Sequence, residues 1–371
     1  MAIDSLTQRI RDAARCLGFF RTGVAKPGPL PWQEKFDTWL GQGMHGEMGY
    51  IERQAAKRSD PSLVLENVHS ILVMPMNYYW GGAPGEGPLS GRISRYGWGE
   101  DYHRLLTGRM KALLTYIQSE EPSTRGLYYA DTGPVMEKTW GAHSALGWLG
   151  KHSNLISRER GSWFFLGVML LTCQLEYDLP EKDRCGTCTR CLMACPTGAI
   201  VAPYVVDARL CISYLTIELR GIIPRHLRAM MGNRIFGCDD CQDVCPWNRF
   251  AVPTSEPAFQ PCETNPVPEL TELASLTAGE FAARFRNRPI LRAKRDGFVR
   301  NVVVALGNSH RPEAVPALTK ALRDKSALVR GHAAWALGEI AAPEAMAALV
   351  AASEAEADPW VVDEMALALD K

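Results

Sequence analysis

The chain has 371 residues, which is too long for one simple core and long enough for two or three domains. Hydrophobic residues make up 46% and charged residues 22%, a balance typical of a folded soluble protein. Because the formal net charge is zero, bulk attraction to a polyanion is excluded, and an anionic partner must meet a local basic patch.

The N-terminal stretch 1–20 predicts an amphipathic helix rather than a signal peptide. Its apolar residues recur at helical spacing among charges: Ile3, Leu6, Ile10, Ala13 and Leu17. The longest apolar run, 163–173, is about half the length that a membrane span needs. We therefore expect a cytoplasmic protein that does not enter a membrane. There its eleven cysteines stay reduced, which favours metal ligands over disulfides.

Residues 1–180 predict a mixed α/β domain. Apolar runs at 70–79 and 126–133 have the pattern of buried strands that end in loops, and 102–118 has helical periodicity. The glycine-rich stretch 81–91 predicts a surface loop, because its spacing is not that of a phosphate-binding motif. Cys16 and Cys173 lie on apolar faces and are predicted to be small core residues.

Residues 181–262 carry eight cysteines in short, turn-rich segments, besides Cys262 at the end of the range. The first four follow C-x2-C-x2-C-x3-C-P, the bacterial ferredoxin pattern, in which the fourth cysteine ligates a second cluster. Crossing the partners predicts two [4Fe-4S] clusters. One is held by Cys185, Cys188, Cys191 and Cys245, and the other by Cys195, Cys211, Cys238 and Cys241. The alternative is two zinc sites, since C-x2-C pairs also bind zinc, but the two Cys-Pro ends favour iron and sulfur.

Residues 263–371 predict a linker followed by helical repeats. The proline-rich stretch 253–270, which includes Cys262, is expected to wrap the surface without regular structure. After it, PEAVPAL at 312 recurs as PEAMAAL at 343, and GFVRNVVVALG at 297 recurs as ALVRGHAAWALG at 327. A period of about 31 residues with two short helices predicts HEAT-like repeats. Because two to three repeats cannot bury a core alone, we expect them to pack on the preceding domain.

Taken together, these segments resemble the epoxyqueuosine reductase family, the cobalamin-dependent iron–sulfur enzymes of tRNA queuosine biosynthesis. The resemblance covers nearly the whole chain and rests on these motifs: HGEMGYIERQAAKRSDPSLVLENVHSILV, SRYGWGEDYH, YADTGPVMEKTWGAHSALGWLGKHSNLIS, GSWFFLG, CISYLTIELRG, CDDCQDVCPWN, the eight cysteines and the repeats. It implies an α+β multidomain fold with a nitroreductase-like cobalamin domain, a ferredoxin-like two-cluster module and HEAT-like repeats. It also implies reduction of epoxyqueuosine to queuosine at the wobble position of tRNA.

The resemblance implies that Asp131, in YADTGPVMEK, is the catalytic proton donor. Losing the epoxide oxygen as water requires protons, and a buried carboxyl group with a raised pKa beside cobalt would supply one. From the local sequence alone, Asp131 is a turn or capping residue before a helix beginning at Pro134. Glu137 is the weaker alternative donor. His103 is not expected to ligate cobalt, because Leu106 replaces the glycine of the D-x-H-x-x-G motif; with Asp101 it is expected to cap a helix.

The resemblance also implies residues that contact the cobalamin. Arg58 would bind the polar side chains of the corrin, although by local sequence it is a solvated arginine before an Asp60–Pro61 helix start. Lys151 and Asn154, in the polar cluster 151–154, would donate hydrogen bonds to corrin amides; the alternative is a plain surface loop, although such a loop would have fewer flanking aromatic residues. Ser213, with Tyr214, would lie between a cluster and the corrin, or simply pack around the cluster.

Two basic segments predict contacts with a tRNA anticodon stem-loop. Segment 284–300 has seven arginines and lysines against one acid, and segment 220–234 adds four arginines beside the cluster ligands. The predicted phosphate contacts are Arg225, Arg228, Lys294, Arg295 and Arg300. The alternative for such runs is an ordinary solvated face.

Two other functions stay open at this point. One is a corrinoid enzyme acting on a small molecule, like the reductive dehalogenases, and the other is a non-catalytic electron-transfer or scaffold protein. We expect a monomer that receives electrons from an external donor.

Overall fold

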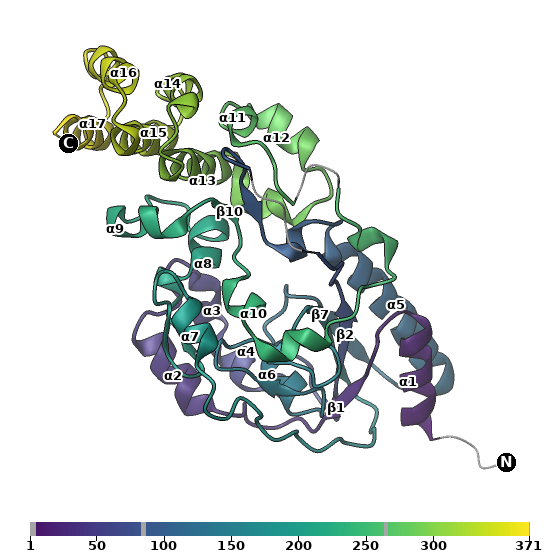
Figure 1. The fold of residues 1–371 in the computed structure, drawn as a ribbon. Helices are drawn as coiled ribbons and strands as arrows, with labels where there is room; N and C mark the ends of the chain where they lie inside the picture. The colour runs from purple at the N-terminus through teal and green to yellow at the C-terminus, as the bar shows by residue number, and fades with distance from the viewer. Residues whose placement is uncertain (1–4, 83–86, 263–265, 371) are drawn as a thin grey trace.

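The computed structural model describes residues 5–82, 87–262 and 266–370, and its first part is a four-stranded sheet with helices on both faces (Figure 1). The strand order is β1-β2-β7-β4, and each neighbouring pair is antiparallel. The strands are β1 (Gly23–Ala25), β2 (Ser70–Asn77), β7 (Phe164–Leu171) and β4 (Gly126–Tyr129).

Strand β2, one of the two central strands, is apolar from Ile71 to Met76 because both of its faces are covered. Alternate side chains point to opposite faces of a strand. Leu72 and Met74 pack under α1 (Leu6–Cys16) and α5 (Tyr102–Glu120). Ile71 and Val73 pack on the other face, where α6 (Glu137–Ala142) lies. The shorter elements of this part are α2 (Gln33–Gly41), α3 (Gly49–Arg53), α4 (Ala55–Ser59), β3 (Arg92–Ile93), β5 (Trp148–Leu149) and β6 (Leu155–Ile156).

The cysteine-rich part is built from short elements and is joined to the first part by the sheet pair β3–β10. In this pair Arg92 lies opposite Arg234 and the strands are parallel. The elements are α7 (Arg190–Ala194), β8 (Ile200–Ala202), β9 (Val205–Val206), α8 (Ile212–Ile217), α9 (Arg225–Arg228), β10 (Arg234–Phe236) and α10 (Asp240–Asp243). Segments far apart in sequence therefore meet around the cysteines.

The C-terminal part is a stack of paired helices at the end of the molecule opposite α1 (Figure 1). Its helices are α11 (Leu270–Leu273), α12 (Ala278–Arg284), α13 (Lys294–Asn308), α14 (Val315–Ala321), α15 (Ala327–Ile340), α16 (Pro343–Ser353) and α17 (Pro359–Leu369). One continuous hydrophobic core runs from Leu215 of α8 through Val302 of α13 to Met365 of α17. The expectation that the repeats pack on the preceding part is therefore confirmed.

The repeated ALG triplet has a packing reason. A Cβ on Gly307 would lie 2.8 Å from the Cα of Ala336, and one on Gly338 would lie 2.9 Å from the Cα of Ala368. Glycine at this point of each unit lets successive long helices cross closely, which a larger residue would prevent.

Most elements predicted from periodicity are present, with some corrections. The N-terminal helix spans Leu6–Cys16 and is capped by Ser5, while Ile3 lies outside the described residues, as do residues 83–86 of the glycine-rich loop. Cys173 is buried as predicted, but Cys16 is exposed at the last turn of α1, so its core assignment is wrong. Across 5–82, 87–262 and 266–370, no helix combines the length and apolarity that crossing a membrane requires.

Segment 253–270 wraps the surface as predicted, in the residues that the structure describes. It has one short 3-10 turn, Pro257–Phe259, whose Phe259 is buried against Phe165 of β7. Thr254 N donates to Tyr79 O, which holds the segment along the first part. The domain boundaries at 180 and 262 stay predictions.

Candidate active site and cluster cavities

The eight predicted cysteine ligands separate into two groups of four around two cavities. The outer cavity, of 230 Å³, is lined by Cys185, Cys188, Cys191 and Cys245. The central cavity, of 470 Å³, is lined by Cys195, Cys211, Cys238 and Cys241. These are the two sets that the crossed ferredoxin pattern predicts.

The pKa values of the Cys191 and Cys241 thiols are consistent with the same two groups, because each is raised by cysteines of its own set. Burial raises the pKa of the Cys191 thiol, and Cys185 and Cys245 raise it further. Burial also raises the pKa of the Cys241 thiol, with added contributions from Cys238 and Cys211.

Each set of four cysteines lines part of a cavity and does not converge on a single point. In the described part of the chain, no three His, Cys, Asp or Glu side chains converge as ligands of a single ion would. The thiolates of a cubane lie around a four-iron cube, whereas the ligands of zinc lie about one atom. Four cysteines on the wall of one cavity are the donor set that a [4Fe-4S] cluster requires.

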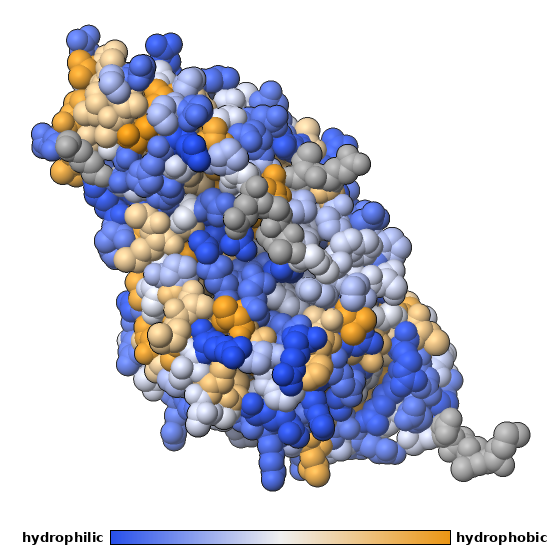
Figure 2. All heavy atoms as spheres, viewed as in Figure 1, coloured by the Kyte–Doolittle hydropathy of each residue, from blue (hydrophilic) through white to orange (hydrophobic). Residues whose placement is uncertain are grey.

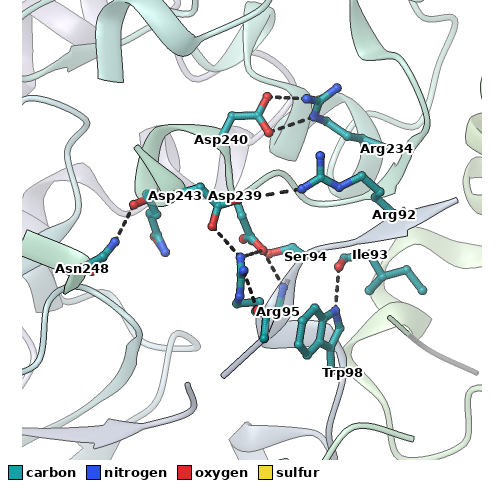
Figure 3. Close-up of polar contacts among 12 residues, drawn as sticks. Arg92, Ile93, Ser94, Arg95, Trp98, Arg234, Asp239, Asp240, Asp243 and Asn248 are labelled. Atoms are coloured by element: carbon teal, nitrogen blue, oxygen red, sulfur yellow. Dashed lines mark hydrogen bonds and ion pairs between the residues drawn. The ribbon is translucent and has the colours of Figure 1, made fainter. Parts of the chain in front are cut away.

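A buried polar network holds the second half of the cysteine module against the first part (Figure 3). Asp239 lies between two cysteine ligands and accepts hydrogen bonds from Ser94 Oγ at 2.5 Å and Arg95 N at 2.8 Å. Arg95 Nη1 also donates to Asp243 Oδ1 at 2.6 Å. Burial raises the pKa of Asp239, while its bonds to Ser94 and Arg95 lower it. The sequence pattern did not reveal this network, because its partners are more than 140 residues apart.

The central cavity also contains the predicted catalytic residue. Asp131 follows β4 in a left-handed conformation with φ 60°, and its Oδ2 accepts a hydrogen bond from Tyr102 Oη at 2.9 Å. Burial and the charge of Asp131 raise the pKa of Tyr102, so the phenol keeps its proton and remains a donor. Tyr102 stacks on Phe165, which fixes its ring. Sequence analysis missed Tyr102, although its position beside Asp101 at the start of α5 was a usable signal.

Three local expectations around Asp131 require correction or refinement. The expected helix begins at Glu137 rather than at Pro134, so Asp131 does not cap it. Asp131 is exposed, not buried. Glu137, the alternative donor, has a raised pKa: burial, and then the charge of Asp131, raise it to about 8.

The N-terminus of α5 is capped as its sequence predicts. Asp101 accepts a hydrogen bond from His103 N at 3.0 Å, which caps the helix, and its carboxylate also contacts His103 Nδ1 at 2.6 Å. The capping interpretation is confirmed. The Asp60–Pro61 start is also present, as a 3-10 turn over Pro61–Leu63 capped by Asp60.

Of the four predicted cobalamin contacts, two line the central cavity. Asn154 contacts Gln242 through its amide nitrogen at 3.0 Å and accepts from Lys138 Nζ at 2.7 Å, and Ser213 lies beside Cys211. Arg58 lines a neighbouring side cavity of 590 Å³ that shares Lys138, Ser153 and Val206 with the central one.

Lys151 lies elsewhere than predicted. It is buried beside the outer cavity, where its Nζ donates to Gly186 O at 2.7 Å and Cys188 O at 2.9 Å. It therefore stabilises the cysteine loop instead of reaching the central cavity. Tyr214 is also turned away, because its hydroxyl accepts a hydrogen bond from Glu47 N at 2.8 Å.

Two buried polar atoms beside these cavities indicate that a polar group fits there. Arg58 Nε and His152 Nε2 have no hydrogen-bond partner among the described residues. Arg58 lines the side cavity and His152 lines the central one. Because buried donors and acceptors are nearly always satisfied, a large ligand rich in amides, such as a corrin, fits these walls.

Two of the five predicted phosphate contacts are wrong, because their side chains are buried. Arg228 is 1% exposed and forms two hydrogen bonds to Glu364, at 2.8 and 2.6 Å. Arg300 is 0% exposed and donates to the backbone carbonyls of Leu215 and Gly221 at 2.6 Å each. Both arginines bind the repeats to the cysteine module.

The other three predicted phosphate contacts differ in their exposure to solvent and in their ion pairs. Arg295 is paired with Asp324 at 2.5 and 2.7 Å and is largely buried. Arg225 is paired with Glu364 at 2.7 Å and is partly exposed. Lys294, which begins α13, is exposed.

Each of the three parts of the chain matches a known protein family. Residues 58–132 match the family described as epoxyqueuosine reductase QueG, DUF1730, residues 184–248 match the 4Fe-4S double cluster binding domain, and residues 289–370 match HEAT repeats. The cysteine module is thus a double [4Fe-4S] domain, as the spacing predicted. The HEAT-like prediction for the C-terminal part is also confirmed.

Relatives resemble the chain along nearly its full length. The epoxyqueuosine reductase of Escherichia coli is 39% identical over 341 residues, covering 91% of this chain and 90% of that protein. That of Xanthomonas campestris is 41% identical over 340 residues, covering 89% and 95%.

Solved structures agree. An epoxyqueuosine reductase crystallised with an epoxyqueuosine-modified tRNA-Tyr stem loop has a TM-score of 0.93 at 29% identity, covering 98% of each chain. The Bacillus subtilis enzyme, solved with its aspartate catalytic loop swung out of the active site, has a TM-score of 0.91 at 29% identity, also covering 98% of each chain. This chain belongs to the epoxyqueuosine reductase family.

Proposed function

We propose that this chain reduces epoxyqueuosine in the wobble position of tRNA to queuosine. The observation that carries the proposal is the central cavity, where Asp131 and four cysteine ligands line one chamber. Relatives that match the chain over about nine-tenths of its length carry the name of this reaction, and a related structure was solved with a tRNA stem loop that bears the modified base. A wobble base that unstacks from the anticodon can enter such a chamber while phosphates fix its orientation.

Loss of the epoxide oxygen as water consumes two electrons and two protons. When bound, cobalamin supplies a low-valent cobalt next to the substrate, and the two [4Fe-4S] clusters supply electrons one at a time. The chain itself must bind the base, exclude water and deliver protons.

Asp131 is our proposed proton donor. Tyr102 orients the Asp131 carboxyl group through its 2.9 Å hydrogen bond, and the left-handed turn after β4 places Asp131 on the wall of the central cavity. The aspartate catalytic loop of the Bacillus subtilis relative supports this role. Glu137 lines the same cavity and keeps a proton up to about pH 8, so it is the second candidate donor.

The corrin would lie across the central and side cavities. Arg58, Asn154 and Ser213 remain the proposed contacts, since each lines one of these cavities. The corresponding architecture would be a nitroreductase-like cobalamin domain over 1–180, a ferredoxin-like module over 181–262 and a linker with repeats over 263–371. We also propose a cytoplasmic monomer that binds an anticodon stem-loop through exposed Lys294 and partly exposed Arg225.

One assay tests the function. The protein is reconstituted anaerobically with iron, sulfide and cobalamin, a low-potential reductant is added, and tRNA carrying epoxyqueuosine is analysed by mass spectrometry. We expect loss of one oxygen. Intact tRNA despite full iron and cobalamin content would contradict the proposal and leave the electron-transfer alternative. Turnover of a halogenated small molecule without binding of tRNA would instead favour the dehalogenase-like alternative.

The same assay tests Asp131. Asp131→Asn should retain iron and cobalamin and lower turnover about 10²- to 10⁴-fold, the usual contribution of a positioned acid. Asp363→Asn, a matched change on the exposed surface of α17, should turn over like the parent. Equal rates for the two variants would remove Asp131 from the proton path.

A further inference from the structure

The outer cavity is surrounded by a cationic surface that the proposed reaction does not use. Arg184, Arg190 and Arg249 all line this cavity together with the four outer cysteines, and all three are exposed. An open groove of 840 Å³ continues from it and is also lined by Arg190 and Arg249. Since the whole chain has no net charge, this concentration of positive charge is local.

These arginines differ from most others in the cysteine module because their charges are not neutralised. Among the described residues, none of the three has a carboxylate within ion-pair distance, whereas Arg225, Arg228 and Arg234 are all paired. The nearby acids contact other groups: Asp243 pairs with Arg95, and Asp183 accepts hydrogen bonds from Tyr204 Oη and Cys185 N.

Apolar side chains lie beside these charges. Met193, in α7, is 84% exposed, and Phe250 and Val252, just after Cys245, are 39% and 47% exposed. Arg249 lies over the Phe250 ring at 4.6 Å. Figure 2 shows orange and blue side chains intermixed over the region of α7 and α10 in Figure 1. Exposed apolar residues within a charged rim are the composition of a protein docking site.

We propose that this surface, Arg184, Arg190, Met193, Arg249 and Phe250, docks an acidic one-electron carrier protein. This inference rests on the proposed function, which requires two electrons for each epoxide. In each docking event the carrier loses one electron and the outer [4Fe-4S] cluster gains one. Two events supply the pair that, with two protons, converts the epoxide oxygen to water.

The position of the surface favours a carrier over tRNA. The substrate base must reach Asp131 in the central cavity, whereas the outer cysteines line a different cavity from Asp131. Electron transfer weakens steeply with distance, so a donor protein gains from approaching the outer cluster. A carrier also fits the chemistry of the surface, because complementary charge steers transient partners and small apolar contacts let them dissociate.

The experiment compares two reductants. Reduced flavodoxin, chosen as an acidic carrier, and the methyl viologen radical cation are each mixed with the cluster-loaded protein in a stopped-flow spectrometer, and bleaching of the clusters is followed. For the double variant Arg184→Gln, Arg190→Gln, we expect the flavodoxin rate constant to fall about tenfold at low salt and the viologen rate not to fall. The loss should largely disappear at high salt.

Controls separate docking from cluster assembly and from the proposed function. Arg311→Gln with Arg323→Gln removes two exposed arginines of the repeat part and should leave the flavodoxin rate unchanged. Arg249→Glu tests the same surface outside the first cysteine loop, and calorimetric titration with oxidised flavodoxin should show weaker binding at equal iron content.

Two results would overturn the docking proposal: equal flavodoxin rates with an unchanged salt slope, or a loss in tRNA affinity in place of the loss in flavodoxin rate. If viologen-driven reduction of tRNA fails while the flavodoxin effect is present, the proposed function is wrong and the docking site is not.

Discussion

Arg300 gives the sharpest test of the structure, because its sequence and its environment indicate opposite roles. Its Nη1 donates to Leu219 O at 3.1 Å and to Gly221 O at 2.6 Å, and its Nη2 donates to Leu215 O at 2.6 Å. These carbonyls lie in and just after α8, the helix that follows Cys211. The side chain is fully buried, and burial lowers its pKa. Arg300 therefore satisfies one carbonyl in the last turn of α8 and two carbonyls of the chain just beyond it.

The change Arg300→Met keeps much of the side-chain volume and removes the donors. A buried acceptor without a partner costs about 1–3 kcal/mol, so three carbonyls at the low end of that range give a loss of about 3–5 kcal/mol. Global unfolding of a multidomain chain is not two-state, so the loss is best measured locally. Amide hydrogen exchange in α8 should accelerate about 10²- to 4 × 10³-fold, since 1.4 kcal/mol corresponds to a factor of ten.

A matched control separates this role from binding to phosphate. Arg311→Met, on the exposed surface, should leave exchange in α8 unchanged. Arg300→Met should leave the salt dependence of tRNA binding unchanged in slope, whereas loss of a phosphate contact lowers the slope by about one. Unchanged exchange together with a lower slope would refute the buried role and restore the phosphate contact predicted from the sequence.

Three further predictions follow from other contacts. Glu364→Gln leaves Arg228 buried without a counter-charge, which should cost about 3–5 kcal/mol and speed exchange in α9 and α17, whereas Asp363→Gln beside it should have no such effect. The folded-state pKa of Glu137, about 8, lies above its usual 4.5, so its contribution to stability is fully present below about pH 4.5 and lost as pH rises through 8. Glu137→Gln should therefore flatten the pH dependence of local stability between pH 5 and 8, measured by amide hydrogen exchange in α6 after correction for intrinsic exchange rates, and an unchanged pH profile would contradict the raised pKa. Cys245→Ser should lower iron by one cluster and leave the other, as measured by iron content and electron paramagnetic resonance; loss of both clusters would show that the two sets are not independent.

Local chemistry explains why the cysteine module could be predicted so fully. Ligand spacing in a ferredoxin motif is set within ten residues, and the Cys-Pro ends direct the chain in the same short range. To assign the eight cysteines to two clusters, it was enough to let each cluster take ligands from both halves of the motif. The structure brings the same two sets of four together. Strand β2 and helix α5 could also be predicted from the sequence, because the burial of a strand and of one face of a helix each leave a recognisable pattern of apolar residues.

Polar side chains were predicted less well, because their roles depend on distant segments. Lys151 looked like a cofactor ligand within its own loop, but its partners lie 35 and 37 residues further on. A buried carboxyl group was expected at Asp131, but Asp131 is exposed, and Glu137 is the more buried of the two, with a pKa that burial raises to about 8. Cys16 has an apolar neighbourhood in sequence, yet it lies at the exposed end of α1.

The sequence by itself determined the residues that can hold iron and sulfur, the main helices and strands, and the family. Each of these depends on residue type at short spacing. Only the tertiary structure decided which charges remain available to a partner. Arg228 and Arg190 are the same residue type in the same module, but Arg228 meets Glu364 from 136 residues away while Arg190 meets solvent. The free energy of a charge depends on its burial and its counter-charge, and both are set by which distant segments the fold brings together.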